Sequence, residues 1–274
     1  FLCILPLAII SILEDLFQNI SVKFRLISIL VSSTALVIST NTILSDIDVF
    51  LINSILNIPI IAILFTVIGL TATSNAFNFI DGLNGLASGL ALIILLVFVY
   101  LSTLTNQDQL MLLLIVVCIS LLPIFLLNIS TGKIFLGDTG AYFLGLFIGW
   151  SGVYLTLNNS NISPWTIFSF ILYPALELIF SCFRRIFKRN SPFNADNEHL
   201  HSMVFFFLNS KTNIRWINSF TGLLILLYAS IPVILFFLID SSFGTTIRII
   251  FLYSIVYLLL WFILKHFIIN IVKN

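Results

Sequence analysis

Four short polar patches interrupt an otherwise very apolar chain, and they hold the residue types that could do chemistry. They are Glu14-Asp15, the run from Asn75 to Asn84, Gly137-Asp138-Thr139-Gly140, and the basic stretch from Arg184 to His201. Carboxylate oxygens are the ligands that a hard cation such as Mg²⁺ prefers, and arginine side chains suit phosphate. The four patches together predict a site that handles a metal and a phosphate.

The second patch, NAFNFIDGLN, carries four amide or acid groups, at Asn75, Asn78, Asp81 and Asn84. The first three recur at every third position, so on a helix they lie along one face. A capping role for Asp81 at the start of the next helix would explain one such group. It would not explain four, which favours a surface that binds a polar ligand.

Acids in the other patches have structural alternatives. Asp138 lies between glycines at the start of an apolar segment, where it could cap a helix, hold Mg²⁺, or do both. Glu14 and Asp15 end another apolar segment, where they are solvated end charges or functional acids. Glu177 lies inside an apolar run, which makes it a functional candidate by default.

The basic stretch contains Arg184, Arg185, Lys188 and Arg189. These cations could simply anchor a helix on the positively charged side of a membrane, and Arg184 or Arg185 could instead pair with Glu177. His199 and His201 follow, beside Asp196 and Glu198. Two imidazoles next to a cationic run suit phosphate binding or acid–base chemistry.

Composition places these patches in a membrane protein. Of 274 residues, 60% are hydrophobic and 8% are charged, whereas a soluble domain is about one-quarter charged. The apolar segments that are long enough to cross a bilayer, or nearly so, are Phe24–Leu44, Ile58–Thr73, Leu83–Leu104, Leu110–Leu127, Ala141–Leu157, Pro164–Cys182, Trp216–Ile239 and Ile247–Ile269. The residues before Glu14 give only about 20 Å of helix against a hydrocarbon core of about 30 Å. We therefore expect an all-α polytopic integral membrane protein with about nine transmembrane helices, the first incomplete, and with N-terminal helices missing.

Counting the spans brings all four patches to one membrane face. Eleven of the twelve Lys and Arg residues fall on that face, and Arg248 alone falls on the other. This bias marks the cytoplasmic side. We expect a single, N-terminally truncated transmembrane domain over residues 1–274, with cytoplasmic active-site loops near residues 14–23, 74–85, 131–140 and 183–215.

The motifs NAFNFIDGLNGLASG, FLGDTGAYFLG and SPFNADNEHLH, in this order, resemble those of the polyprenyl-phosphate N-acetylhexosamine-1-phosphate transferases (glycosyltransferase family 4). That family includes undecaprenyl-phosphate GlcNAc-1-phosphate transferases and the phospho-MurNAc-pentapeptide translocase. The resemblance implies transfer of a HexNAc-1-phosphate, with GlcNAc-1-phosphate favoured, from a UDP-sugar to undecaprenyl phosphate, with release of UMP. It implies a step that starts cell-envelope polysaccharide synthesis in the bacterial inner membrane.

The resemblance also implies the partners and the roles of the residues. The expected partners are a UDP-sugar, a polyprenyl phosphate lipid and Mg²⁺, with Mn²⁺ as an alternative ion; a homodimer is compatible, and no nucleic acid is expected. The expected catalytic residues are Glu14, Asp15, Asp81, His199 and His201. The expected metal ligands are Asp138 and Asp81. The expected substrate-binding residues are Asn75, Asn78, Asn84, Phe135, Arg184, Arg185, Lys188 and Arg189.

Two other functions stay open at this point. A membrane transporter could carry acids along a substrate path, but transporters place such groups near the bilayer midplane, often within repeats. Here the acids gather at helix ends on one face, and no repeat is visible. An inactive homologue is the second alternative, because Glu14, Asn84 and Ser202 stand where the family commonly has Asp, Asp and His.

Overall fold

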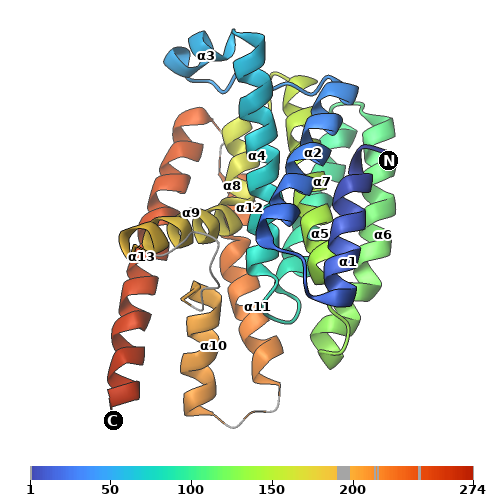
Figure 1. Ribbon diagram of the computed structural model, residues 1–274. Helices are drawn as coiled ribbons and strands as arrows, with labels where there is room; N and C mark the ends of the chain where they lie inside the picture. Colours follow the sequence, from blue (N-terminus) through green and yellow to red (C-terminus); the bar gives the residue numbers. More distant parts are fainter. Residues whose placement is uncertain (1, 190–197, 213, 215, 240–241, 274) are drawn as a thin grey trace.

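The structure is a computed structural model that describes residues 2–189, 198–212, 214, 216–239 and 242–273. In this part of the chain every regular element is a helix (Figure 1). The helices are α1 (Leu5–Phe17), α2 (Val22–Thr40), α3 (Phe50–Leu56), α4 (Pro59–Ile80), α5 (Leu86–Leu104), α6 (Asp108–Thr131), α7 (Gly137–Leu157), α8 (Pro164–Phe170), α9 (Leu172–Phe187), α10 (Leu200–Lys211), α11 (Ile217–Ala229), α12 (Ile231–Leu238) and α13 (Phe243–Lys273), after a 3-10 turn at Leu2–Ile4. Asp196 and part of the predicted loop 183–215 lie outside the described residues.

The predicted apolar segments coincide with helices. Seven helical stretches among the described residues are long and apolar enough to cross a membrane, namely α2, α4, α5, α6, α7, α11–α12 and α13. The pair α8–α9 would add an eighth if it forms one span. The multi-pass helical class is therefore confirmed, while the count of about nine spans and the missing N-terminal helices stay predictions.

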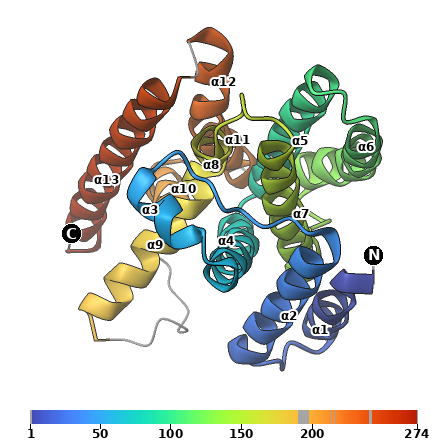
Figure 2. The same cartoon turned by 90° about the horizontal axis from the view of Figure 1, so that it is seen from above.

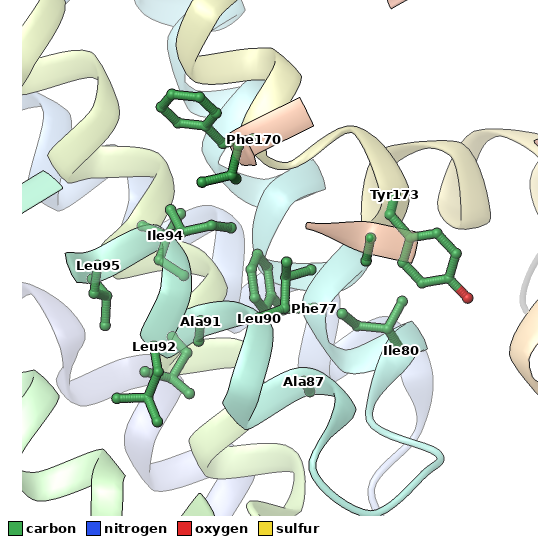
Figure 3. Packing of buried hydrophobic residues seen from close by; sticks show 14 of the residues in the cluster. Phe77, Ile80, Ala87, Leu90, Ala91, Leu92, Ile94, Leu95, Phe170 and Tyr173 are labelled. Atoms are coloured by element: carbon green, nitrogen blue, oxygen red, sulfur yellow. The ribbon is translucent and has the colours of Figure 1, made fainter. Parts of the chain in front are cut away.

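Among the candidate spans, α5 has the largest buried share. Figure 3 shows Leu90 and Ile94 of this helix close to Phe77 of α4 and Phe170 of α8, all four fully buried. Most of α5 is buried, while Leu96, Tyr100 and Leu104 are exposed. Helices α4 and α7 also approach closely, because a Cβ added at Gly145 would meet the Thr73 carbonyl oxygen at 2.6 Å. This closely packed region carries the polar ends of α4 and α7.

The segment Pro164–Cys182, predicted as one run, is broken in the structure. Helices α8 and α9 meet at Ile171 with a bend of 78°, so α9 runs across the long axis of the bundle (Figure 1). Pro174 accounts for the break, since its ring lacks an N–H and clashes with the carbonyl four residues earlier in a continuous helix. The bend turns one face of α9, with Glu177, Arg184 and Arg185, toward the protein interior.

The polar patches gather at one end of the bundle. The end of α1, the turn between α4 and α5, and the start of α7 lie at the end opposite α3 (Figure 1). Seen along the bundle, α1, α2, α4 and α7 are neighbours (Figure 2). The predicted meeting of distant patches is thus seen in the structure. Which side of a membrane this end faces stays a prediction.

Candidate active site

Asp138 lies where three of the patches meet. Asn78 on α4 donates a hydrogen bond from Nδ2 to Asp138 Oδ1 over 2.9 Å, and Arg25 on α2 forms an ion pair with Oδ2. Arg25 Nη1 is also 3.7 Å from Glu14 Oε1, and Glu14 Oε2 accepts the Ile20 N–H over 2.8 Å. Sequence reasoning missed Arg25 as a site residue. Arg25 could have been recognised from its position just after the first acidic patch, on the same predicted membrane face.

Asp15 caps α7 from another helix. Its Oδ1 accepts the Asp138 N–H over 2.8 Å, and its Oδ2 accepts the N–H and the hydroxyl of Thr139 over 3.1 and 2.6 Å. Gly137 has φ +66°, and a Cβ there would lie 2.9 Å from Asp15 Oδ2. The cap role predicted as an alternative for Asp138 is therefore wrong: Asp15 supplies the cap, and the Asp138 side chain stays directed at Asn78 and Arg25.

Asp81 ends α4 rather than starting α5. The capping role weighed for it does not hold, because Gly85, not Asp81, precedes the first residue of α5, Leu86. Burial raises the pKa of Asp81 to about 7, and the negative charges of Asp138 and Asp15 add to this rise. Three carboxylates from three segments thus interact electrostatically at one place. Such a site gains stability when a cation binds.

The two other amides of the second patch have partners within the protein. The Asn84 N–H donates to Asn218 Oδ1 over 2.8 Å, and Asn84 Nδ2 donates to Ser219 Oγ over 3.1 Å. Asn75 Nδ2 donates to the Thr71 carbonyl over 2.8 Å. The substrate-binding roles of both residues stay predictions.

The donor set fits Mg²⁺ that is bound together with a phosphate. Among the described residues, no group of three or more His, Cys, Asp and Glu side chains could hold a metal ion. These residues therefore do not form a metal site made of protein ligands alone. Mg²⁺ commonly uses one or two carboxylates together with water and substrate phosphates. Asp81 and Asp138 supply two carboxylates, and Arg25 competes with a cation for Asp138.

The histidine segment reaches the same site. His199 and His201 are buried and stacked, with ring centroids 5.3 Å apart and an interplanar angle of 13°. A Cβ added at Gly82, next to Asp81, would lie 3.1 Å from His201 Nε2. The acid that contacts these rings is Glu177, which lies 2.9 Å from His199 Nδ1. Glu177 forms ion pairs with His199 and His201, while its pairing with Arg184 or Arg185 stays a prediction.

The predicted cationic residues divide between two environments. Arg184 stacks between Phe180 and Trp261, and its Nε is 3.3 Å from Glu198 Oε2, a carboxylate that Lys188 also contacts at 2.7 Å. Arg185 lies over the Phe79 ring, 5.5 Å from its centroid. Arg189 is exposed, as is Phe135, the aromatic residue predicted to contact the substrate. Their roles in substrate binding stay predictions.

A groove joins the polar site to an apolar surface. It has a volume of about 810 Å³; Arg25, Asn75, Asn78, Arg185 and His199 line its polar part. Leu26, Leu30, Ile68, Phe183 and Ile186 line the rest. A second cavity of about 370 Å³, lined almost wholly by apolar side chains, shares Ala72, Leu178 and Ile179 with the groove. The arrangement can hold a charged head group with a long apolar tail.

Comparison with known proteins identifies relatives of this chain. The sequence model described as "Glycosyl transferase family 4" matches residues 1–156. An undecaprenyl-phosphate alpha-N-acetylglucosaminyl 1-phosphate transferase of Escherichia coli O157:H7 is 27% identical over 207 residues, which are 74% of this chain and 56% of that protein. Proteins of the same name from Thermotoga maritima and Yersinia pestis are 28% and 31% identical, over 73% and 51% of this chain and 59% and 40% of their own lengths. The chain thus spans about half the length of the curated relatives it matches.

Proposed function

The chain belongs to glycosyl transferase family 4, and on this basis we propose that it transfers an N-acetylhexosamine-1-phosphate, with GlcNAc-1-phosphate favoured, from a UDP-sugar to undecaprenyl phosphate. The names of its relatives state this acceptor and this sugar. The single observation that carries the proposal is the groove in which Arg25, Asn78 and His199 lie in the polar part and mostly apolar side chains form the rest. A lipid phosphate likewise consists of a charged head group and an apolar chain.

In the proposed reaction an oxygen of the lipid phosphate attacks the phosphorus that carries the sugar. The bond from this phosphorus to the bridging oxygen breaks, and UMP leaves with that oxygen. A phosphate monoester has a second pKa near 6, so the nucleophile is already ionised at neutral pH and needs no strong base. Phosphoryl transfer asks the protein mainly for positioning and charge neutralisation.

The residues divide these tasks. Asp138 and Asp81 would hold Mg²⁺, which when bound stabilises the charge that develops on the leaving phosphate. Arg25 and Arg185, which line the polar part of the groove, would neutralise the lipid phosphate. Asp15 keeps the start of α7, and with it Asp138, in place. We place the site at the cytoplasmic face of the bacterial inner membrane and the reaction at the start of a cell-envelope polysaccharide.

The direct test is an assay of the protein in proteoliposomes with undecaprenyl phosphate, Mg²⁺ and a panel of UDP-sugars. We expect release of UMP and formation of a lipid-linked sugar diphosphate with UDP-GlcNAc. Release must depend on the lipid. Movement of intact UDP-GlcNAc into sealed vesicles without UMP would support a transporter instead, and no turnover with any sugar would support an inactive homologue.

The tail groove gives a prediction of its own. Ala72 lines both cavities, so Ala72→Trp should block the path of the polyprenyl chain. We expect the KM for undecaprenyl phosphate to rise about tenfold, which corresponds to the loss of roughly 1.4 kcal/mol of binding, while the KM for the UDP-sugar changes little. Leu96→Trp is the control, because Leu96 is exposed on α5 away from both cavities. Equal KM values for lipid in the two variants would place the tail elsewhere.

The raised pKa of Asp81 predicts that Mg²⁺ binding depends on pH. A carboxyl group must lose its proton to bind a metal, and the pKa of Asp81 is raised to about 7. Below that pH, protons compete with the cation, so the dissociation constant should rise by about tenfold per pH unit. Calorimetric titration with MgCl₂ between pH 5 and 8 measures this slope. In Asp81→Asn the slope should disappear, and a slope unchanged in that variant would remove Asp81 from the metal site.

A further inference from the structure

Glu177 is an acid in a place where an unpartnered carboxylate is very costly. It lies on α9 within the apolar run and is 1% exposed. Four donors surround its two oxygens. Oε2 lies 2.9 Å from His199 Nδ1, and Oε1 lies 3.0 Å from both the Leu200 N–H nitrogen and the Tyr173 hydroxyl. His201 Nδ1 lies 3.5 Å from Oε1.

The protons of this cluster can be assigned by counting. An ionised carboxylate only accepts hydrogen bonds, so His199 must carry a proton on Nδ1. Tyr173 has one hydroxyl proton, and it donates this proton in a hydrogen bond of 3.0 Å to Glu177 Oε1. His201 Nδ1 lies 3.3 Å from the Tyr173 oxygen and 3.5 Å from Glu177 Oε1. Since neither oxygen has a proton left to donate, Nδ1 of His201 must also be the donor.

Both rings reach the candidate active site. With Nδ1 turned to Glu177, His201 directs Nε2 at the Asp81-Gly82 turn, where a Cβ on Gly82 would be 3.1 Å away. His199 borders the groove and packs edge-on against Phe79, with centroids 5.5 Å apart. Arg185 lines the same groove and lies over the Phe79 ring, 5.5 Å from its centroid.

We propose that Glu177 is a positioning residue that holds His199 and His201 side by side as Nδ1–H tautomers and presents both Nε2 atoms to the phosphate-binding site. A neutral ring held in this way offers a lone pair at Nε2, and a protonated ring offers a second N–H. One carboxylate thus sets the chemistry of two imidazoles. The role of Glu177 in turnover rests on the proposed function. The assignment of the histidine tautomers does not depend on it.

Nuclear magnetic resonance of ¹⁵N-histidine-labelled protein tests the tautomers directly. The chain has three histidines, so three ring signals are expected, and His266→Gln identifies the one outside the cluster. In the wild-type protein both remaining rings, when neutral, should carry the proton on Nδ1. This measurement needs no variant of Glu177 and no activity.

Glu177→Gln then tests what holds the tautomers. The Leu200 N–H and the Tyr173 hydroxyl require an oxygen at the Oε1 position, so the new NH₂ group must face His199 Nδ1. His199 should therefore move its proton to Nε2, while His201 keeps its proton on Nδ1. Because partners that orient a functional group are worth about 10–100-fold, we expect kcat to fall by that factor and the KM for the UDP-sugar to change less.

Tyr173→Phe is the matched control, since it leaves the carboxylate in place and should leave both rings as Nδ1–H tautomers. A wild-type spectrum with the His199 proton on Nε2, or a Glu177→Gln spectrum without a change at His199, overturns the proposal. If the spectra are as expected but the wild-type protein releases no UMP, the positioning role of Glu177 stands and the transferase function falls. If the protein releases UMP but the spectra are contrary, the transferase function stands and the positioning role of Glu177 falls.

Discussion

Asp138→Asn should abolish Mg²⁺-dependent release of UMP. The substitution removes one negative charge where Asn78 and Arg25 converge, and with it one of the two carboxylates proposed to bind the cation. Metal stabilisation of developing charge is worth several kcal/mol, so we expect a loss of roughly 10³-fold or more in kcat. The fold should persist, because Asp15 binds the backbone N–H of residue 138 and not its side chain.

Asp108→Asn is the matched control for this experiment. Asp108 is the first residue of α6, exposed, at the opposite end of that helix from the site. The Asp108→Asn variant should turn over substrate at the wild-type rate. Both variants should melt at nearly the wild-type temperature. Wild-type turnover by Asp138→Asn would exclude Asp138 from the reaction.

Gly222→Ala should be the most destabilising small substitution in the bundle. A Cβ at Gly222 would lie 2.1 Å from the carbonyl oxygen of Asn84, and a backbone atom cannot move aside as a side-chain end can. Overpacking of this kind costs about 1–3 kcal/mol or more. The melting temperature in detergent should fall by several degrees, and activity should fall with it because the displaced turn carries Asp81.

Gly69→Ala provides the comparison. It makes the same chemical change on α4, where an added Cβ would meet no atom within 4 Å. We expect its melting temperature to match the wild-type value or to rise slightly, since alanine favours a helix over glycine. If both variants melted at the same temperature, the contact between α11 and the Asn84 turn would not exist in the folded protein.

The sequence predicts the helices well because their signal is local. Long apolar runs such as Leu83–Leu104 are read directly from composition, and the alternation of loops between two faces predicts that Asp15, Asp81 and Asp138 meet. The bend between α8 and α9 had a visible signal in Pro174, but an apolar run of suitable length outweighed it. Length alone does not distinguish a straight span from a broken one.

The contacts that set each side chain's task are not local, and the sequence does not encode them by spacing. Asp15 caps a helix that begins 122 residues later, so its separation from Gly137 carries no pattern. Arg25 is an ordinary interfacial cation until the structure pairs it with Asp138. Glu177 is recognisable as an unusual acid, but only the bend between α8 and α9 brings it to the histidines.

Chemical labelling from each side of the membrane tests the shared face most directly. Single cysteines at Gln18, Lys133 and Lys188, in protein whose Cys3, Cys118 and Cys182 are replaced by Ala, report the first, third and fourth patches; Asn158 reports the opposite end. All these positions are exposed. A membrane-impermeant maleimide should label the first three only in inverted vesicles and Asn158 only in spheroplasts. Labelling of any two of the first three from opposite sides would contradict a common active site.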